Sequence, residues 1–136
     1  MTASPSSSLA RAQRAMRDID DFQAWIRGKG GADLIVICRA IGGDVWARRA
    51  RMARQAVVEG RGPYVVRARL QGPLRLLLLG QAGRLPGIGS TTFVGIDPDD
   101  PRAGTVQTCI ERLEAALKAF EVVSLAGAAS KRRAAR

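Results

Sequence analysis

Apolar residues recur at steps of three and four positions near both ends of the chain, which is the spacing of one helical face. The first stretch predicts a helix over residues 9–26, whose apolar face comprises Leu9, Ala12, Met16, Ile19, Phe22 and Ile26. The second predicts an amphipathic helix over residues 105–123, whose apolar face comprises Val106, Ile110, Leu113, Leu117, Phe120 and Val123. Residues 1–8 and 127–136 carry no such period, so we expect a disordered leader and a mobile basic tail around a single domain, 9–126.

A third apolar pattern with helical spacing lies between these two helices, and a pair of glycines interrupts it. Gly42 and Gly43 together cost a helix about 2 kcal/mol relative to two alanines. We therefore expect two helices, over residues 33–41 and 44–59, with Asp44 as the N-cap of the second. One long kinked helix is the alternative.

The middle of the chain changes to the alternating pattern of a β-strand. Apolar and polar residues alternate over residues 64–70, and the Gln-Gly-Pro that follows at 71–73 is typical of a turn. The leucine-rich run at 74–79 is expected to be the second strand of a hairpin, although such a run is also compatible with a helix. Residues 91–96 are expected to form a third strand.

Together these elements predict an α+β fold with N-terminal helices, a small antiparallel sheet with a β-hairpin, and a C-terminal amphipathic helix. Three helices followed by a hairpin are also the order of a winged helix-turn-helix, in which the helix over 44–59 reads DNA. One feature fits that motif poorly. Arg48, Arg49 and Arg51 fall where it normally buries apolar side chains.

The charge balance indicates a polyanionic partner. The chain has 22 lysines and arginines against 12 acidic residues, for a formal net charge of +10 and a pI near 11.3. The excess is greatest in the first 70 residues, which hold 13 basic and 6 acidic side chains. Such a surplus favours nucleic acid as the partner, with DNA ahead of RNA, and a compositional bias toward arginine and alanine is the alternative.

The residue types that are missing argue against an enzyme. The chain contains no histidine, which removes the commonest general base and the commonest transition-metal ligand. Cys38 and Cys109 lie far apart in apolar stretches, so we expect reduced, buried thiols without metal. We expect no catalysis and no cofactor. Without a secretory signal or an apolar run long enough to cross a bilayer, we expect a cytoplasmic protein with no membrane association.

Three groups of basic residues are the candidate nucleic-acid contacts. The helix over 44–59 supplies guanidinium groups at one-turn spacing, which suits phosphate oxygens and guanine edges: Arg48, Arg49, Arg51 and Arg54. The first predicted strand supplies Arg67 and Arg69 beside the wing. The tail supplies a basic arm that grips any polyanion without reading sequence: Lys131, Arg132, Arg133 and Arg136.

Several short motifs bear on the biological role. They are RGKGG at 27–31, the arginine-rich helix, a Gly-Pro strand entry at 62–63 and GSTTFVG at 89–95. Their arrangement resembles an uncharacterised family of small proteins encoded in integrating conjugative elements. The resemblance implies an accessory, regulatory role in a bacterial mobile genetic element, and it supplies no functional residues.

We therefore expect a small, basic, nucleic-acid-binding accessory protein, with DNA as the favoured ligand. Two alternatives stay open. The first is a protein–protein adaptor that docks on an acidic partner, with a homodimer formed through the helix over 9–26 or the helix over 105–123. The second is an RNA- or ribosome-associated protein.

Overall fold

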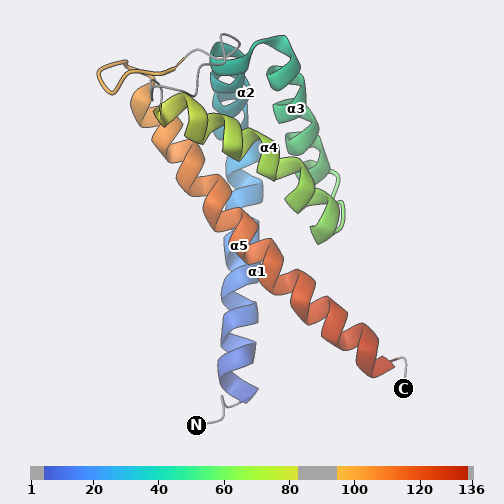
Figure 1. Ribbon diagram of the computed structural model, residues 1–136. Helices are drawn as coiled ribbons and strands as arrows, with labels where there is room; N and C mark the ends of the chain where they lie inside the picture. The colour runs from blue at the N-terminus through green and yellow to red at the C-terminus, as the bar shows by residue number, and fades with distance from the viewer. Residues whose placement is uncertain (1–4, 83–94, 135–136) are drawn as a thin grey trace.

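A computed structural model describes residues 5–82 and 95–134, and all the regular secondary structure in these two ranges is α-helical (Figure 1). Five helices follow one another along the chain. Their bounds are α1 Pro5–Arg27, α2 Lys29–Gly42, α3 Asp44–Val58, α4 Pro63–Ala82 and α5 Ala103–Ala134.

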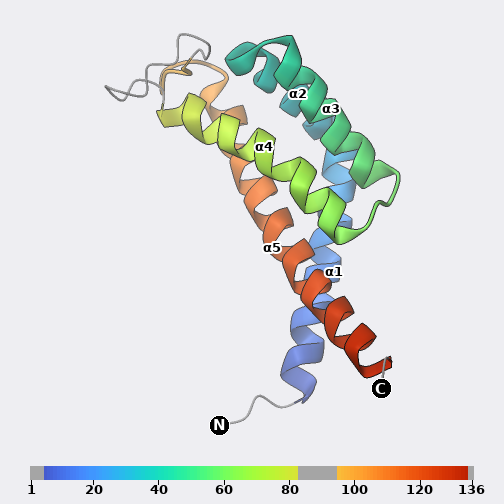
Figure 2. The same cartoon turned by 45° about the vertical axis from the view of Figure 1, so that its right-hand side comes forward.

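The helices form a bundle from which two ends project. α2 and α3 pack as an antiparallel pair, and α4 lies between α3 and α5 (Figures 1 and 2). α1 packs against α5, and the two helices cross and then run apart toward the chain termini. The first part of α1 and the last part of α5 therefore extend beyond the other helices.

One hydrophobic core is built from all five helices. Its fully buried side chains include Ile26, Leu34, Ile41, Leu70, Leu76, Leu77 and Leu113. α3 contributes mostly alanine to it: Ala47, Ala50 and Ala53 are each 0% exposed. Alanine at every third position keeps α3 close to its neighbours. Val45 and Met52, two larger apolar residues of α3, are exposed instead.

The break between α2 and α3 lies at the glycine pair, as the sequence predicts. Gly43 has φ +85°, a left-handed value that residues with a Cβ rarely adopt. Its N–H donates to the Arg39 carbonyl at 2.8 Å, which satisfies one free carbonyl at the end of α2. The chain therefore forms two helices here, and the single kinked helix is excluded.

The predicted β-hairpin is wrong, because residues 64–70 and 74–79 belong to the single helix α4. The apolar positions that matter are Val66, Leu70, Pro73 and Leu77, whose steps of four, three and four form one buried face. Pro73 lies inside the helix, where proline costs about 3 kcal/mol relative to alanine. Burial of the leucines around it offsets that cost.

Because the described ranges contain no hairpin, the predicted α+β fold and the predicted winged-helix arrangement are also wrong. Residues 91–94 of the predicted third strand lie outside the described ranges. Ile96 is buried, but it belongs to no strand, and its N–H donates to the Gly80 carbonyl at 2.9 Å. The described part of the chain holds no sheet and therefore no wing.

The terminal helices are longer than the sequence patterns suggest. α1 begins at Pro5, inside the expected leader, and α5 continues to Ala134, inside the expected tail. Helix bounds do not measure motion, so the mobility of these ends stays a prediction.

Candidate nucleic-acid interface

α3 presents its arginines on the side opposite its buried alanines. Because Ala47, Ala50 and Ala53 face the core, three of the four arginines of α3 project into solvent. We refer to these three residues, Arg48, Arg49 and Arg51, as the α3 arginine surface. The local sequence dictates the arrangement, since alanine and arginine are both good helix formers and only alanine fits a tight interface.

The carboxylates at the two ends of α3 are paired with arginines from outside the helix. Asp44 lies 3.3 Å from Nε of Arg39, and Glu59 lies 3.3 Å from Nε of Arg61. A hydrogen bond from Gln55, followed by one from Arg61, lowers the pKa of the Glu59 carboxyl. Neither carboxylate is therefore the partner of an arginine in the α3 arginine surface.

The members of the α3 arginine surface are held to different degrees. The guanidinium of Arg49 stacks over the Trp46 ring at 4.5 Å from its centroid, which fixes its direction by a cation–π interaction. Arg48 and Arg51 make no hydrogen bond or ion pair with any residue in the described ranges. Their guanidinium groups present full donor sets to solvent.

Arg54 has a different position from the other arginines of α3, because it turns toward the end of α1. Its Nε donates to the Ile26 carbonyl at 2.8 Å, and its Nη2 donates to the Arg27 carbonyl at 2.6 Å. These are carbonyls of the last turn of α1, which lack partners within their own helix. A positive charge there is also favoured by the helix dipole. Arg54 thus joins α3 to α1.

The two candidates that were placed on a strand lie instead on α4. Arg67 is partly buried, and its Nε is buried without a hydrogen-bond partner in the described part of the chain. Arg69 is exposed and lines a groove of about 300 Å³ with Met52 and Gln55 of α3. Arg69 therefore lies across this groove from α3, in a lining that also holds Glu59 and Arg61, whereas Arg67 does not line it.

The tail residues are described only in part. Lys131, Arg132 and Arg133 lie in the last turns of α5, whereas Arg136 lies outside the described ranges. Within the described ranges α5 makes no contact with α3.

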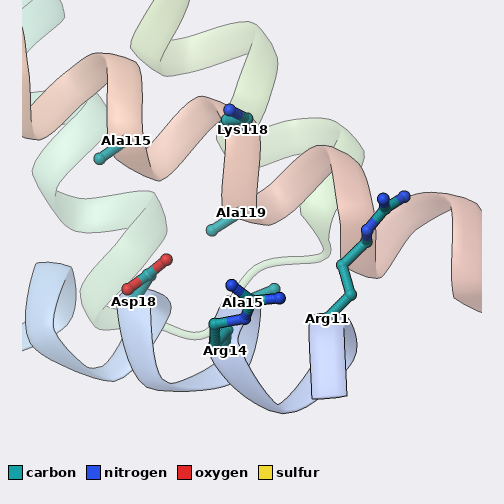
Figure 3. Close-up of a pocket in the computed structure, with 7 residues that line it drawn as sticks. All are labelled: Arg11, Arg14, Ala15, Asp18, Ala115, Lys118 and Ala119. Atoms are coloured by element: carbon teal, nitrogen blue, oxygen red, sulfur yellow. The ribbon is translucent and has the colours of Figure 1, made fainter. Parts of the chain in front are cut away.

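A second group of cations was not predicted from the sequence. Arg11 and Arg14 of α1 lie around a cleft between α1 and α5 together with Lys118 (Figure 3). The sequence pattern indicates that Arg11 and Arg14 share a helical face. That Lys118 lies opposite them follows only from the crossing of the two helices.

Within residues 5–82 and 95–134, no three histidine, cysteine or acidic side chains gather where they could hold a metal ion. No helix in these ranges is both long and apolar enough to span a bilayer.

Comparison of the chain with protein-family models, curated proteins and solved structures gives no match.

Proposed function

We propose that this protein is a nucleic-acid-binding protein whose ligand is duplex DNA and whose principal contact is the α3 arginine surface. The observation that carries the proposal is the isolation of Arg48 and Arg51, which are exposed and unpaired in the described structure. The nearby acids, Asp44 and Glu59, are already paired with Arg39 and Arg61. Unpaired guanidinium groups on one helix suit phosphate oxygens and guanine edges.

DNA is favoured over RNA on geometric grounds. The major groove of B-DNA admits an α-helix, whereas the major groove of A-form RNA is too deep and narrow for side chains to read. The exposed face of α3 carries three arginines over fewer than two helical turns, which matches contact with a short stretch of one groove. Arg69 adds a fourth cation from α4.

The role proposed for the bound protein is that of an accessory or regulatory factor of a mobile genetic element. It is proposed to have no catalytic activity of its own and no cofactor.

The experiment that tests this function is a titration of labelled duplex DNA with the purified protein between 50 and 200 mM salt. If about five phosphates are neutralised, the slope of log affinity against log salt is about −4 to −5. Duplex RNA of the same length is the matched ligand, and we expect weaker binding to it. A slope near zero, or no binding at 50 mM salt, contradicts the proposal.

A protein–protein adaptor is the second candidate, and the exposed apolar residues of α3 favour it. Val45 is 62% exposed and Met52 is 38% exposed, and both lie within about one helical turn of Arg48 and Arg49. An acidic partner protein with apolar anchors would complement such a surface. Pull-down from a lysate before and after nuclease treatment separates the two functions, because only a direct protein partner survives digestion of nucleic acid.

A further inference from the structure

The point at which α1 and α5 begin to diverge is hollowed into a cleft of about 560 Å³. Its floor is made of alanine: Ala15 and Ala119 are each 4% exposed. Figure 3 shows Arg11 and Asp18 extending from α1 toward α5, with Arg14 beside Ala15 on α1 and Ala119 on the α5 side of the cleft. The cleft therefore has short side chains below and long charged side chains around it.

The charged side chains around the cleft are mostly cations without partners. Arg11, Arg14 and Lys118 are exposed, and none of them makes a hydrogen bond or ion pair with another residue of the described ranges. Asp18 is the one carboxylate in the lining, so three positive charges and one negative charge leave a formal charge of +2. Like charges held on facing helices repel one another, and a bound anion relieves that repulsion.

The donors around the cleft suit a phosphate group. Guanidinium groups bind phosphate oxygens through paired N–H donors, and an ammonium group binds them as a point charge. Alanine at Ala15, Ala115 and Ala119 lets such a group come close to both helix backbones. A cleft of this volume also has room for the sugar to which a phosphate is attached.

We infer that the cleft between α1 and α5 is a phosphate-binding site, with Arg11, Arg14 and Lys118 as its donors. The source of the phosphate rests on the function proposed above, in which it belongs to the backbone of the bound nucleic acid. A free phosphate or a mononucleotide offers the same chemistry. The site is separate from the α3 arginine surface, because Arg14 lies about 20 Å along α1 from the end that Arg54 contacts.

The first test compares two double variants with the same change in net charge. Arg14→Gln with Lys118→Gln removes two cations from the cleft. Arg17→Gln with Arg112→Gln removes two exposed cations from the same two helices outside it. We expect the cleft pair to lower affinity for a DNA duplex at least tenfold at 100 mM salt and to flatten the salt slope by about 1.8. We expect the control pair to change affinity less than about threefold.

A second test reverses the sign of the effect. Asp18→Asn removes the carboxylate of the cleft lining, and Asp20→Asn removes an exposed carboxylate of α1 that does not line the cleft. Asp18→Asn is expected to raise the affinity for the DNA duplex severalfold, whereas Asp20→Asn is expected to raise it less. Both substitutions are on the surface, so neither is expected to alter the melting temperature measurably.

Amide NMR titrations of the full chain identify the source of the phosphate. The probes are inorganic phosphate, adenosine monophosphate and a short DNA duplex, followed at Ala15, Ala115 and Ala119. Shifts at these residues with the duplex, at lower concentration than with phosphate, support the nucleic-acid source. Saturable shifts with phosphate or nucleotide alone support the cleft and contradict that source, even if the wild type binds no duplex. The proposal is overturned if no probe shifts these amides, or if the cleft pair and the control pair lose DNA affinity equally.

Discussion

Replacement of Arg54 by alanine is expected to destabilise the protein, whereas replacement of Arg48 or Arg51, which have no partner in the described ranges, is expected to leave its stability nearly unchanged. Arg54 donates to the Ile26 carbonyl at 2.8 Å and to the Arg27 carbonyl at 2.6 Å. A hydrogen bond that involves a charged group contributes about 1.5–3 kcal/mol. The bond to Arg27 is exposed and is therefore weaker. We expect Arg54→Ala to lower the free energy of unfolding by about 2–3 kcal/mol in total.

Thermal unfolding followed by circular dichroism measures this loss. For a chain of this length, 1 kcal/mol corresponds to roughly 3–5 °C in Tm, so Arg54→Ala should melt about 6–15 °C lower. Arg51→Ala is the matched control, because Arg51 is one turn away, exposed and without a partner in the described ranges. Its effect is expected to stay within about 0.5 kcal/mol.

A third variant separates the hydrogen bonds from the charge. Arg54→Lys keeps the positive charge near the end of α1 but loses the planar pair of donors, so it should recover only part of the lost stability. If Arg54→Ala and Arg51→Ala melt at the same temperature, Arg54 does not join α3 to α1 and the reasoning is refuted.

Three further predictions concern packing, the reactivity of the buried thiols and stability at high pH. A Cβ added at Gly31 would lie 1.8 Å from the Ile26 carbonyl oxygen, so Gly31→Ala should cost about 3 kcal/mol or more. Gly104→Ala meets no atom within 4 Å and should be neutral or stabilising, and equal urea midpoints for the two variants would contradict this account. Burial and the nearby Cys109 thiol raise the pKa of Cys38 to about 12, whereas burial and then the charge of Asp33 raise that of Cys109 to about 11. A thiol reagent at pH 8 should therefore label native protein far more slowly than unfolded protein. Fast labelling of both thiols in the native protein would show that Cys38 and Cys109 are not buried. Because folding raises both pKa values, the native state retains protons above about pH 9, and we expect stability to fall as pH rises toward 12.

Helices α1, α2, α3 and α5 were predictable, because apolar residues recur at helical spacing in each of these four segments. In α5, the predicted positions Val106, Ile110 and Leu113 are all buried. The break at Gly43 was predictable from the cost of adjacent glycines and is confirmed by the positive φ there. In α1 the apolar spacing continues beyond the core, since Leu9 lies in the projecting end and is 60% exposed.

The hairpin was predicted wrongly because two periodicities coincide in the same segment. Val66 and Leu70 belong both to an alternating pattern and to a helical one. The positions that distinguish the two are Tyr64 and Ala68, and both are exposed. A half-buried strand would have placed Tyr64 and Ala68 on the same buried face as Val66 and Leu70. A helix turns Tyr64 and Ala68 away from the core. Only the packing of α4 against its neighbours decides between them.

The candidate site was predictable in composition and less so in geometry. The sequence shows that α3 is rich in arginine, and its alanine spacing implies that most of these arginines face outward. It does not show that Arg54 meets the end of α1, because that contact depends on how two helices cross. The placement of Lys118 opposite Arg14 depends in the same way on the crossing of α1 and α5.

The most direct test of the central claim is the affinity of the double variant Arg48→Ala with Arg51→Ala for duplex DNA. Both side chains are exposed and unpaired in the described structure. The free energy of unfolding of the variant should therefore lie within about 1 kcal/mol of the wild-type value. Each substitution should cost about 1–3 kcal/mol of binding free energy on a preferred site and less on scrambled DNA. The control, Arg17→Ala with Arg112→Ala, carries the same net charge and should bind nearly as well as the wild type. Equal losses for the two double variants would show that α3 is not the contact surface and that only overall charge drives binding.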